Sequence, residues 1–309
     1  MKNKKSVVTI GTFDGIHKGH RALIDKTLSI AKKKNLKSII IALEKPLKNA
    51  KEVLTTLEEK KEILKILSPD EFIIFPLCAE FLSISAQEFF DSFLIGHYKM
   101  QTLICGRDFA FGKDRKGNIN WLKKKTKESG INIKIIPPLK IDGKKVSSSA
   151  IRSMLKSSQI EKANKLLGRP YTIDGIHFRE KGIASKFGFP TINLKTDPSK
   201  LMPRGVFISW IVDKNKLFPS ITNIGYRPTL YKTKTLSTEV HILGFKGVWK
   251  TKKVKIALIK QIRKEKKFSS FKALQEQIKK DIQEAQNYFH KSVKLNFDNN
   301  PQNKIALIL

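Results

Sequence analysis

Cysteine, arginine and long apolar runs are scarce in this sequence, and each scarcity excludes a class of protein. The chain of 309 residues holds two cysteines, Cys78 and Cys105. Each lies in an apolar stretch, which predicts two buried free thiols and excludes a disulfide-stapled module. Uncharged apolar runs such as residues 38–43 are far shorter than the ~20 residues of a membrane-spanning helix, and no secretory signal follows the first basic residues. We therefore expect a cytoplasmic protein with no membrane partner.

Acidic residues are also few. Lys and Arg number 61 against 27 Asp and Glu, which gives a formal net charge of +34. Such an excess is typical of nucleic-acid-binding proteins, because cationic side chains neutralise phosphates. Nucleic-acid binding is therefore kept as an alternative to an enzymatic function. Nine of the 61 are Arg, however, although base-edge and bidentate phosphate recognition favours the planar guanidinium. We interpret the lysines, which are spread along the whole chain, as a solvated surface that attracts polyphosphate substrates and no specific nucleic acid.

The first half of the chain alternates strand-like and helix-like segments, which predicts an α/β domain with a Rossmann-like parallel sheet. The predicted strands lie at residues 5–10, 38–43, 71–75, 103–105 and 131–136, and the predicted helices at residues 21–33, 57–67 and 86–95. A further helix over residues 150–167 ends at Gly168. We place the domain boundary there, which gives domains at residues 1–168 and 169–309.

The second half has short strand-like runs separated by turn residues, which predicts a small β-barrel. These runs lie at residues 171–173, 191–194, 205–212, 218–224, 237–243 and 253–258. The apolar residues of segment 271–289 fall on one helical face, so we expect a helix that packs on the barrel, with Ser269 or Ser270 as its N-cap. The tail at residues 296–309 receives no assigned role.

A first candidate site is the segment GTFDGIHKGH (residues 11–20), which leaves a predicted buried strand and enters a helix. Ligands of open α/β sheets bind at the carboxyl ends of strands, and a helix N-terminus favours a phosphate. His17 and His20 can face the same anion. Two alternatives stay open: a zinc pair completed by Asp14, or histidines that only cap or solvate the turn. A catalytic zinc needs three protein ligands, and the segment fixes no third ligand at the usual spacing.

A second piece is VSSSAIR (residues 146–152), where hydroxyl groups precede a helix and Arg152 follows in its first turn. Such a helix start can bind another phosphate. Taken alone, a run of serines is more often an ordinary N-cap.

Together the two segments resemble the signatures of the HxGH nucleotidyltransferases, with Ser149 where that family has Thr. The segment GRDFAFG (residues 106–112) resembles the flavin-proximal loop in the adenylyltransferase half of the bacterial bifunctional riboflavin kinase/FAD synthetases. The resemblance implies catalytic roles for His17 and His20 and flavin contacts for Asp108 and Phe109. It implies that ATP is bound by Gly11, Thr12, Phe13, Asp14, Gly15, Ser147, Ser148, Ser149 and Arg152.

A third candidate site follows in the second half, where GIASK (residues 182–186) leads into GFPTINL (residues 188–194). The absence of a Walker A motif excludes a P-loop kinase. Thr191 and Asn193 place two small oxygen ligands on one face of a strand. Taken alone, Pro-Thr-x-Asn is more often a strand start than a magnesium site.

Four segments occur in the order found in the riboflavin kinase domain of the same family: GFPTINL, TNIGYRPT (residues 222–229), TEVHIL (residues 238–243) and IRKEKKF (residues 262–268). The resemblance implies that Glu239 is the general base and that Thr191 and Asn193 hold Mg²⁺. It implies ATP contacts for Gly182, Ser185, Lys186, Thr191 and Asn193, and flavin contacts for Asn223, Arg227, Arg263 and Phe268. A carboxylate can take the proton of a ribityl hydroxyl, but Glu239 can also be a cross-strand partner of a lysine.

Over nearly its whole length, about residues 6–290, the sequence therefore resembles the bifunctional riboflavin kinase/FAD synthetase family. The resemblance implies that riboflavin is phosphorylated by Mg·ATP to FMN and that FMN is then adenylylated to FAD with release of pyrophosphate. The alternative is a chain that retains only the kinase, because LEKPL (residues 43–47) lacks the His of the family's Phe-(Asp/Glu)-Pro-His-Pro segment.

Overall fold

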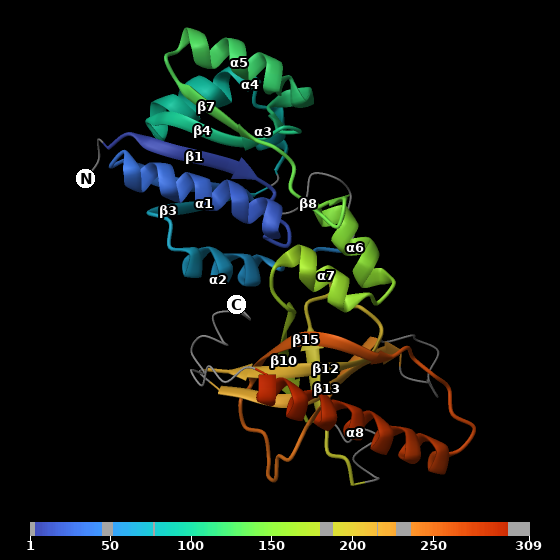
Figure 1. The fold of residues 1–309 in the computed structure, drawn as a ribbon. Helices are drawn as coiled ribbons and strands as arrows, with labels where there is room; N and C mark the ends of the chain where they lie inside the picture. Colours follow the sequence, from blue (N-terminus) through green and yellow to red (C-terminus); the bar gives the residue numbers. More distant parts are fainter. Residues whose placement is uncertain are drawn as a thin grey trace. The chain divides into compact units, whose positions relative to one another are not determined.

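The computed structural model describes residues 4–44, 52–76, 78–179, 188–214, 216–226 and 236–295, without the side chains of residues 292–295. By their internal contacts the residues divide into two compact units, Met1–Ser148 and Ser149–Leu309 (Figure 1). Each unit is described by itself below. The predicted boundary at residues 168/169 stays a prediction.

The first unit is built on a five-stranded parallel sheet with the order β3-β2-β1-β4-β7. Its strands are β1 (Ser6–Gly11), β2 (Lys37–Leu43), β3 (Glu71–Phe75), β4 (Met100–Gly106) and β7 (Asn132–Ile136). The run of β-branched residues in β1 is buried because this strand lies at the centre of the sheet. The predicted α/β architecture is thus confirmed.

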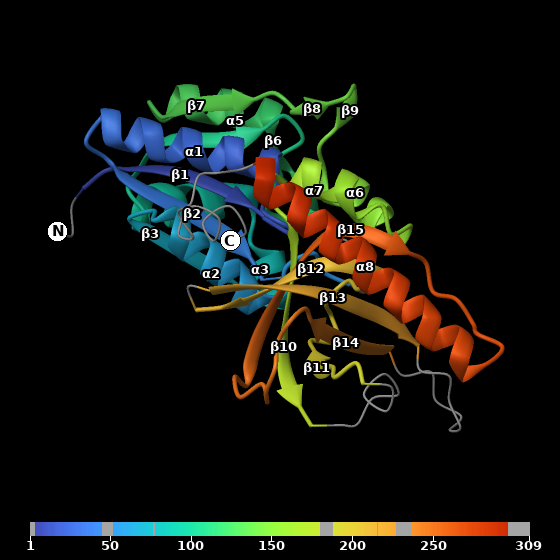
Figure 2. The ribbon, with the colours of Figure 1, turned by 60° about the horizontal axis from the view of Figure 1, so that its bottom comes forward.

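Helices cover both faces of this sheet (Figures 1 and 2). They are α1 (Lys18–Lys33), α2 (Leu57–Leu67), α3 (Ala79–Ser83), α4 (Ala86–Glu88), the π-helix η1 (Phe89–His97) and α5 (Ile119–Glu128). Successive strand residues point to opposite faces. Ile40 accordingly packs with Ile24 of α1 and Leu64 of α2, whereas Ile41 packs with Phe90 of η1.

Short strands and one 3₁₀ helix lie in the loops of this unit. They are β5 (Ala110–Phe111), the 3₁₀ helix η2 (Lys113–Arg115), β6 (Gly117–Asn118), β8 (Lys140–Ile141) and β9 (Lys144–Lys145). The strands β5 and β6 pair with each other, as do β8 and β9. Both pairs lie in loops that leave the carboxyl ends of strands, β4 and β7 respectively.

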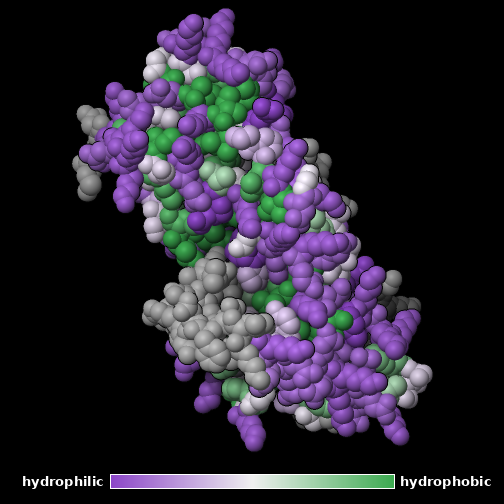
Figure 3. Space-filling view, viewed as in Figure 1, coloured by the Kyte–Doolittle hydropathy of each residue, from purple (hydrophilic) through white to green (hydrophobic). Residues whose placement is uncertain are grey.

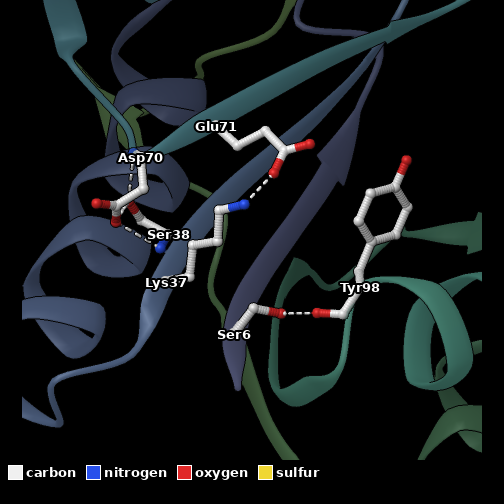
Figure 4. Close-up of polar contacts among 6 residues, drawn as sticks. All are labelled: Ser6, Lys37, Ser38, Asp70, Glu71 and Tyr98. Carbon is white, nitrogen blue, oxygen red and sulfur yellow. Dashed lines mark hydrogen bonds and ion pairs between the residues drawn. The ribbon is translucent and has the colours of Figure 1, made fainter. Parts of the chain in front are cut away.

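Polar side chains tie the opposite, amino-terminal ends of the strands (Figure 4). The carboxylate of Asp70, just before β3, accepts hydrogen bonds from the amide (2.8 Å) and the hydroxyl (2.6 Å) of Ser38. The Ser38 hydroxyl in turn accepts the Asp70 amide at 2.9 Å, and Lys37 forms an ion pair with Glu71. These contacts fix the register of β2 against β3 far from the ligand-binding edge of the sheet.

The second unit contains a closed six-stranded barrel of antiparallel strand pairs in the order β10-β11-β14-β13-β12-β15. The strands are β10 (Tyr171–Phe178), β11 (Ile192–Thr196), β12 (Gly205–Asp213), β13 (Lys216–Tyr226), β14 (Leu236–Ile242) and β15 (Lys253–Arg263); the helices are α6 (Ser148–Lys156), α7 (Ile160–Leu167) and α8 (Phe271–Leu295). The barrel prediction is confirmed. Within the described ranges, none of the helices combines the length and apolar character that crossing a membrane requires.

Helix α8 packs on the barrel, as its one-sided apolar pattern predicts. Ala285 and Phe289 are buried against Ile208 and neighbouring residues of β12 and β13. The ring of Phe289 lies 4.6 Å from that of Trp210. Ser270 is the N-cap, because its hydroxyl accepts the amide of Ala273 at 3.2 Å.

Several local predictions are wrong. Residues 86–95 form the short α4 followed by η1, and α5, capped by the Asn118 side chain, was not predicted. The single helix expected at residues 150–167 is two helices, because Ser158 adopts a positive φ of 59° and its hydroxyl donates to the Arg204 carbonyl at 2.6 Å. Cys105 is buried, and burial raises the pKa of its thiol to about 12, but Cys78 is exposed.

Candidate active sites

The turn between β1 and α1 has an unusual backbone that the core holds in place. Phe13, Gly15 and Ile16 adopt positive φ values of 44°, 87° and 36°. The side chains of Phe13 and Ile16 are fully buried in the apolar cluster that includes Leu64 of α2. The Gly15 amide donates to the Thr55 hydroxyl at 3.1 Å. A left-handed backbone at two bulky residues persists only where packing determines it, so the turn is pre-formed.

Asp14 anchors the same turn to the segment before α2. Its carboxylate is buried and accepts hydrogen bonds from the amides of Leu54 (2.9 Å) and Thr55 (3.2 Å). The zinc alternative needs this carboxylate beside the two histidines. Among the described residues, no group of three or more His, Cys, Asp or Glu side chains is placed to hold a metal ion. The Asp14 carboxylate is thus engaged in holding the turn, and an anion at this turn stays the prediction.

His17 and His20 lie together at the start of α1. His17 is the N-cap of the helix: its Nδ1 accepts the His20 amide at 3.2 Å. The two imidazole rings stack, with centroids 3.7 Å apart and planes 14° from parallel. Capping is therefore part of the role of His17. Because a neutral imidazole whose Nδ1 accepts carries its proton on Nε2, the cap also makes Nε2 a donor.

The serine segment reaches this turn from far along the sequence. The hydroxyl of Ser148, the first residue of α6, donates to the Asp14 carbonyl at 2.8 Å. Ser147 and Ser148 belong to the first unit, while Ser149 and Arg152 belong to the second. The contact joins two of the three N-terminal motifs, and the ATP contacts of Ser149 and Arg152 stay predictions.

The predicted flavin loop lines a pocket of about 330 Å³. Asp108 pairs with Lys145 of β9, and the pKa of its carboxyl is lowered mainly by the hydrogen bond from that ammonium group and by its charge. The ring of Phe109 stacks on Phe111 with centroids 5.6 Å apart. The pocket is lined by Arg107, Asp108, Phe109, Ala110, Arg115, Asn118, Ile119 and Asn120. Sequence reasoning missed Lys145, which lies 37 residues from Asp108 and carries no local signal.

In the barrel, three predicted residues align across three neighbouring strands. Asn193 of β11 lies opposite Glu239 of β14, and Glu239 lies opposite Asn223 of β13. Residues opposite each other in antiparallel strands share a face, so the three side chains gather on one face with Glu239 in the middle. Asn193 is buried at 1% exposure. Glu239 thus lies between two amide side chains, and its role as general base stays a prediction.

Thr191 and His241 flank this cluster. The Thr191 hydroxyl is buried and has no hydrogen-bond partner among the described residues. His241 lies two residues after Glu239, and its Nδ1 is 2.8 Å from the carbonyl oxygen of Pro190, next to Thr191. An unsatisfied buried hydroxyl calls for an unseen partner, and a hydroxyl beside an amide oxygen fits the hard-oxygen chemistry of Mg²⁺. His241 was noted in the sequence only as a neighbour on the same strand face.

Arg263 and Phe268 lie near the start of α8. The Arg263 guanidinium binds the buried carboxylate of Asp281 at 2.9 to 3.1 Å and lies 5.6 Å from the Phe268 ring. Arg263 is therefore held by α8, and its flavin contact stays a prediction. The Glu265 carboxylate, which sequence reasoning missed, accepts the Tyr226 amide at 2.9 Å. Gly182, Ser185, Lys186 and Arg227, like residues 45–47 and the tail, lie outside the described residues.

Comparisons with known proteins match the two parts of the chain to two families. The family model of FAD synthetase matches residues 1–150, and that of riboflavin kinase matches residues 167–289. The chain is 36% identical over 297 residues to the bifunctional riboflavin kinase/FMN adenylyltransferase of Buchnera aphidicola subsp. Schizaphis graminum, covering 93% of this chain and 95% of that one. The chain belongs to the bifunctional riboflavin kinase/FMN adenylyltransferase family. The Bacillus subtilis member is 33% identical, over 92% of this chain and 93% of its own.

As a member of this family, the enzyme phosphorylates riboflavin to FMN and adenylylates FMN to FAD. Both family models match, so the alternative of a kinase alone is not supported. A solved structure described as a macrolide-efflux protein from Streptococcus pneumoniae has the same fold, with a TM-score of 0.83 and 26% identity over 93% of this chain and 95% of its own. The name of that structure describes the Streptococcus pneumoniae protein only. In this chain, residues 1–150 match FAD synthetase and residues 167–289 match riboflavin kinase.

Proposed function

We propose that the turn after β1 is the adenylyl-transfer site. A phosphate oxygen of FMN attacks the α-phosphorus of ATP in line, and pyrophosphate leaves. No protein nucleophile takes part, so positioning and charge stabilisation supply the acceleration. His17 and His20 donate to the ATP phosphates, and Ser147 and Ser148 hold the leaving pyrophosphate. The stacked imidazoles at the mouth of α1, on a turn held by Asp14 and Ser148, support this assignment.

The kinase site is proposed on the barrel face around Glu239. Glu239 takes the proton of the ribityl 5′-hydroxyl as that oxygen attacks the γ-phosphorus of ATP, and ADP leaves. Thr191 and Asn193 are the residues that would hold Mg²⁺, which when bound neutralises charge on the phosphoryl oxygens. Asn223 orients the flavin from the neighbouring strand. The single observation that carries this assignment is the register that sets Asn193 and Asn223 on either side of Glu239.

The two sites predict opposite losses. Glu239→Gln keeps the shape of the side chain but removes the base, and we expect FMN formation to fall by about 10²- to 10⁴-fold. His20→Ala removes a donor to the phosphates, and we expect FAD formation to fall by about 10²- to 10³-fold. The measurement is chromatography of the flavins after incubation with Mg·ATP and either riboflavin or FMN.

Each variant is the control for the other. Glu239→Gln is expected to adenylylate supplied FMN at the normal rate, and His20→Ala to form FMN at the normal rate. Loss of both activities in either variant would contradict two separate sites. We further propose that ATP, riboflavin and FMN are its substrates, that the enzyme works in the cytoplasm, and that residues 1–168 and 169–309 are its functional domains.

A further inference from the structure

Lys60 is a fully buried lysine that the roles above leave unused. It lies in the first turn of α2 at 1% exposure. Its ammonium group donates three hydrogen bonds to main-chain carbonyls: to Leu43 at 2.5 Å, to Thr12 at 3.0 Å and to Glu44 at 3.2 Å. A lysine ammonium has three N–H groups, so each proton has a carbonyl acceptor.

The three carbonyls share a position in the fold. Thr12 directly follows β1, Leu43 ends β2, and Glu44 directly follows β2. These strands are adjacent and parallel, with Gly11 opposite Ala42. Lys60 therefore joins two neighbouring carboxyl ends at the edge where an open α/β sheet binds its ligand.

Burial and neighbouring charges shift the pKa of Lys60 in opposite directions. Burial lowers the pKa of its ammonium to about 8, while the carboxylates of Asp14 and Glu44 raise it. These are the charged groups of the described residues that act on it from the turn and from the end of β2. A methionine or leucine fills a core position without desolvating a charge, so packing alone does not explain a lysine here.

We propose that Lys60 is a positioning residue for adenylyl transfer, which holds the Thr12 end of the phosphate-binding turn against the end of β2. The inference rests on the proposed role of this turn. Thr12 lies between Gly11 and Phe13. The Phe13 ring packs closely against Gly11, because a Cβ added to Gly11 would lie within 3.4 Å of that ring. The backbone around Thr12 therefore has little room to move by itself. A shift of the Thr12 carbonyl therefore changes the backbone that faces the phosphates, although Lys60 itself need not touch ATP.

The test compares Lys60→Met with Lys61→Met. Methionine matches the length and buried volume of lysine but donates no hydrogen bond. Lys61, the next residue of the same helix, has a 40% exposed side chain paired with Glu58 and is the matched control. We expect kcat/KM for ATP in FAD formation to fall by about tenfold or more in Lys60→Met, through a higher KM for ATP and a lower kcat. Lys61→Met is expected to match the unaltered enzyme, and FMN formation is expected to stay unchanged in both.

Further arms separate the possible outcomes. A lower unfolding temperature with unchanged kcat and KM would mean that Lys60 only stabilises the fold, and the proposal would be overturned. His20→Ala is measured alongside: if that variant keeps full FAD formation, the proposed site itself fails, whereas normal Lys60→Met beside a defective His20→Ala overturns only the role of Lys60.

If Lys60→Met does not fold, the role of Lys60 is tested by the pH profile of the unaltered enzyme. The pH dependence of kcat/KM reports groups of the free enzyme. We expect kcat/KM for ATP in FAD formation to decline above about pH 8, as the Lys60 ammonium loses its charge, while FMN formation in the same sample shows no decline there. A profile of FAD formation that stays flat through the titration of Lys60, followed in the same enzyme by NMR of the isotope-labelled lysine side chain, would overturn the proposal.

Discussion

The hydrogen bond from Nδ1 of His241 to the Pro190 carbonyl links β14, two residues after Glu239, to the residue before Thr191. A carbonyl oxygen only accepts, so Nδ1 of His241 carries a proton. We expect His241→Ala to lower kcat/KM of riboflavin phosphorylation by about 10- to 100-fold, as is typical for residues that orient a metal ligand. His241→Asn is expected to recover most of the activity, because its amide nitrogen lies at the same distance from Cβ as Nδ1. The measurement is FMN formation at varied Mg²⁺ and ATP.

His241→Gln is the matched control, since its amide nitrogen lies one atom further along and misses the Pro190 carbonyl. FAD formation from supplied FMN provides the reference rate in every variant. Equal activity of the Asn and Gln variants would show that the hydrogen bond does not position Thr191.

At this same scale, local sequence predicts residue types but not their partners. His17, His20, Thr191, Asn193 and Glu239 were found because their motifs are contiguous. The hydrogen bonds of Lys60 reach carbonyls 16, 17 and 48 residues away, and a carbonyl acceptor leaves no mark in the sequence. The ion pair of Asp108 with Lys145 is hidden for a similar reason, because any of the 61 cationic residues could have supplied it.

Among the elements, β2 and β3 depend on the contacts of Ser38 and Asp70. The Ser38 hydroxyl and then its amide hold the pKa of the Asp70 carboxyl below its usual value. A lowered carboxyl pKa stabilises the fold above the unfolded-state value of about 3.9, and this contribution is lost as the pH falls through the folded-state pKa. We expect Ser38→Ala to reduce the free energy of unfolding by about 1 to 2 kcal/mol at pH 7 and by less near pH 3, measured by urea denaturation.

The exposed Ser129, at the end of α5, offers a matched control. We expect Ser129→Ala to leave the free energy of unfolding within about 0.5 kcal/mol of the unaltered enzyme at both pH values. A deficit in Ser38→Ala that is equally large at pH 7 and pH 3 would contradict the role of the Asp70 charge.

The elements that the sequence predicts correctly are those whose pattern has one cause. The strands of the parallel sheet are continuous apolar runs because both faces are covered, and the apolar stripe of α8 reflects a single partner. The π-helix at Phe89–His97 lies in a run of aromatic residues that fits several helical periods. The break at Ser158 depends on the Arg204 carbonyl, 46 residues away, so no local pattern could place it.

For the molecule as a whole, the formal net charge is +34, and lysines occur along the whole sequence. Hydrophilic residues cover most of the face in view over each unit (Figure 3). Such a surface draws anions by long-range attraction, which salt screens over about 10 Å at 0.1 M ionic strength. The nine arginines are distributed along the sequence, and two of them, Arg107 and Arg115, line the predicted flavin pocket. We therefore expect the charge to raise the local concentration of ATP without selecting a nucleic acid.

This argument gives a prediction that separates the enzyme from a nucleic-acid-binding protein. Binding to an arbitrary labelled duplex is expected to be no tighter than Kd of about 10⁻⁶ M at 0.15 M salt and to weaken steeply as salt rises, since counterion release is its only source. A Lys-rich protein of equal charge and unrelated function is the control, and it should bind equally weakly. Nanomolar binding at 0.15 M salt that Mg·ATP and flavins do not displace would instead point to a nucleic-acid surface separate from both active sites.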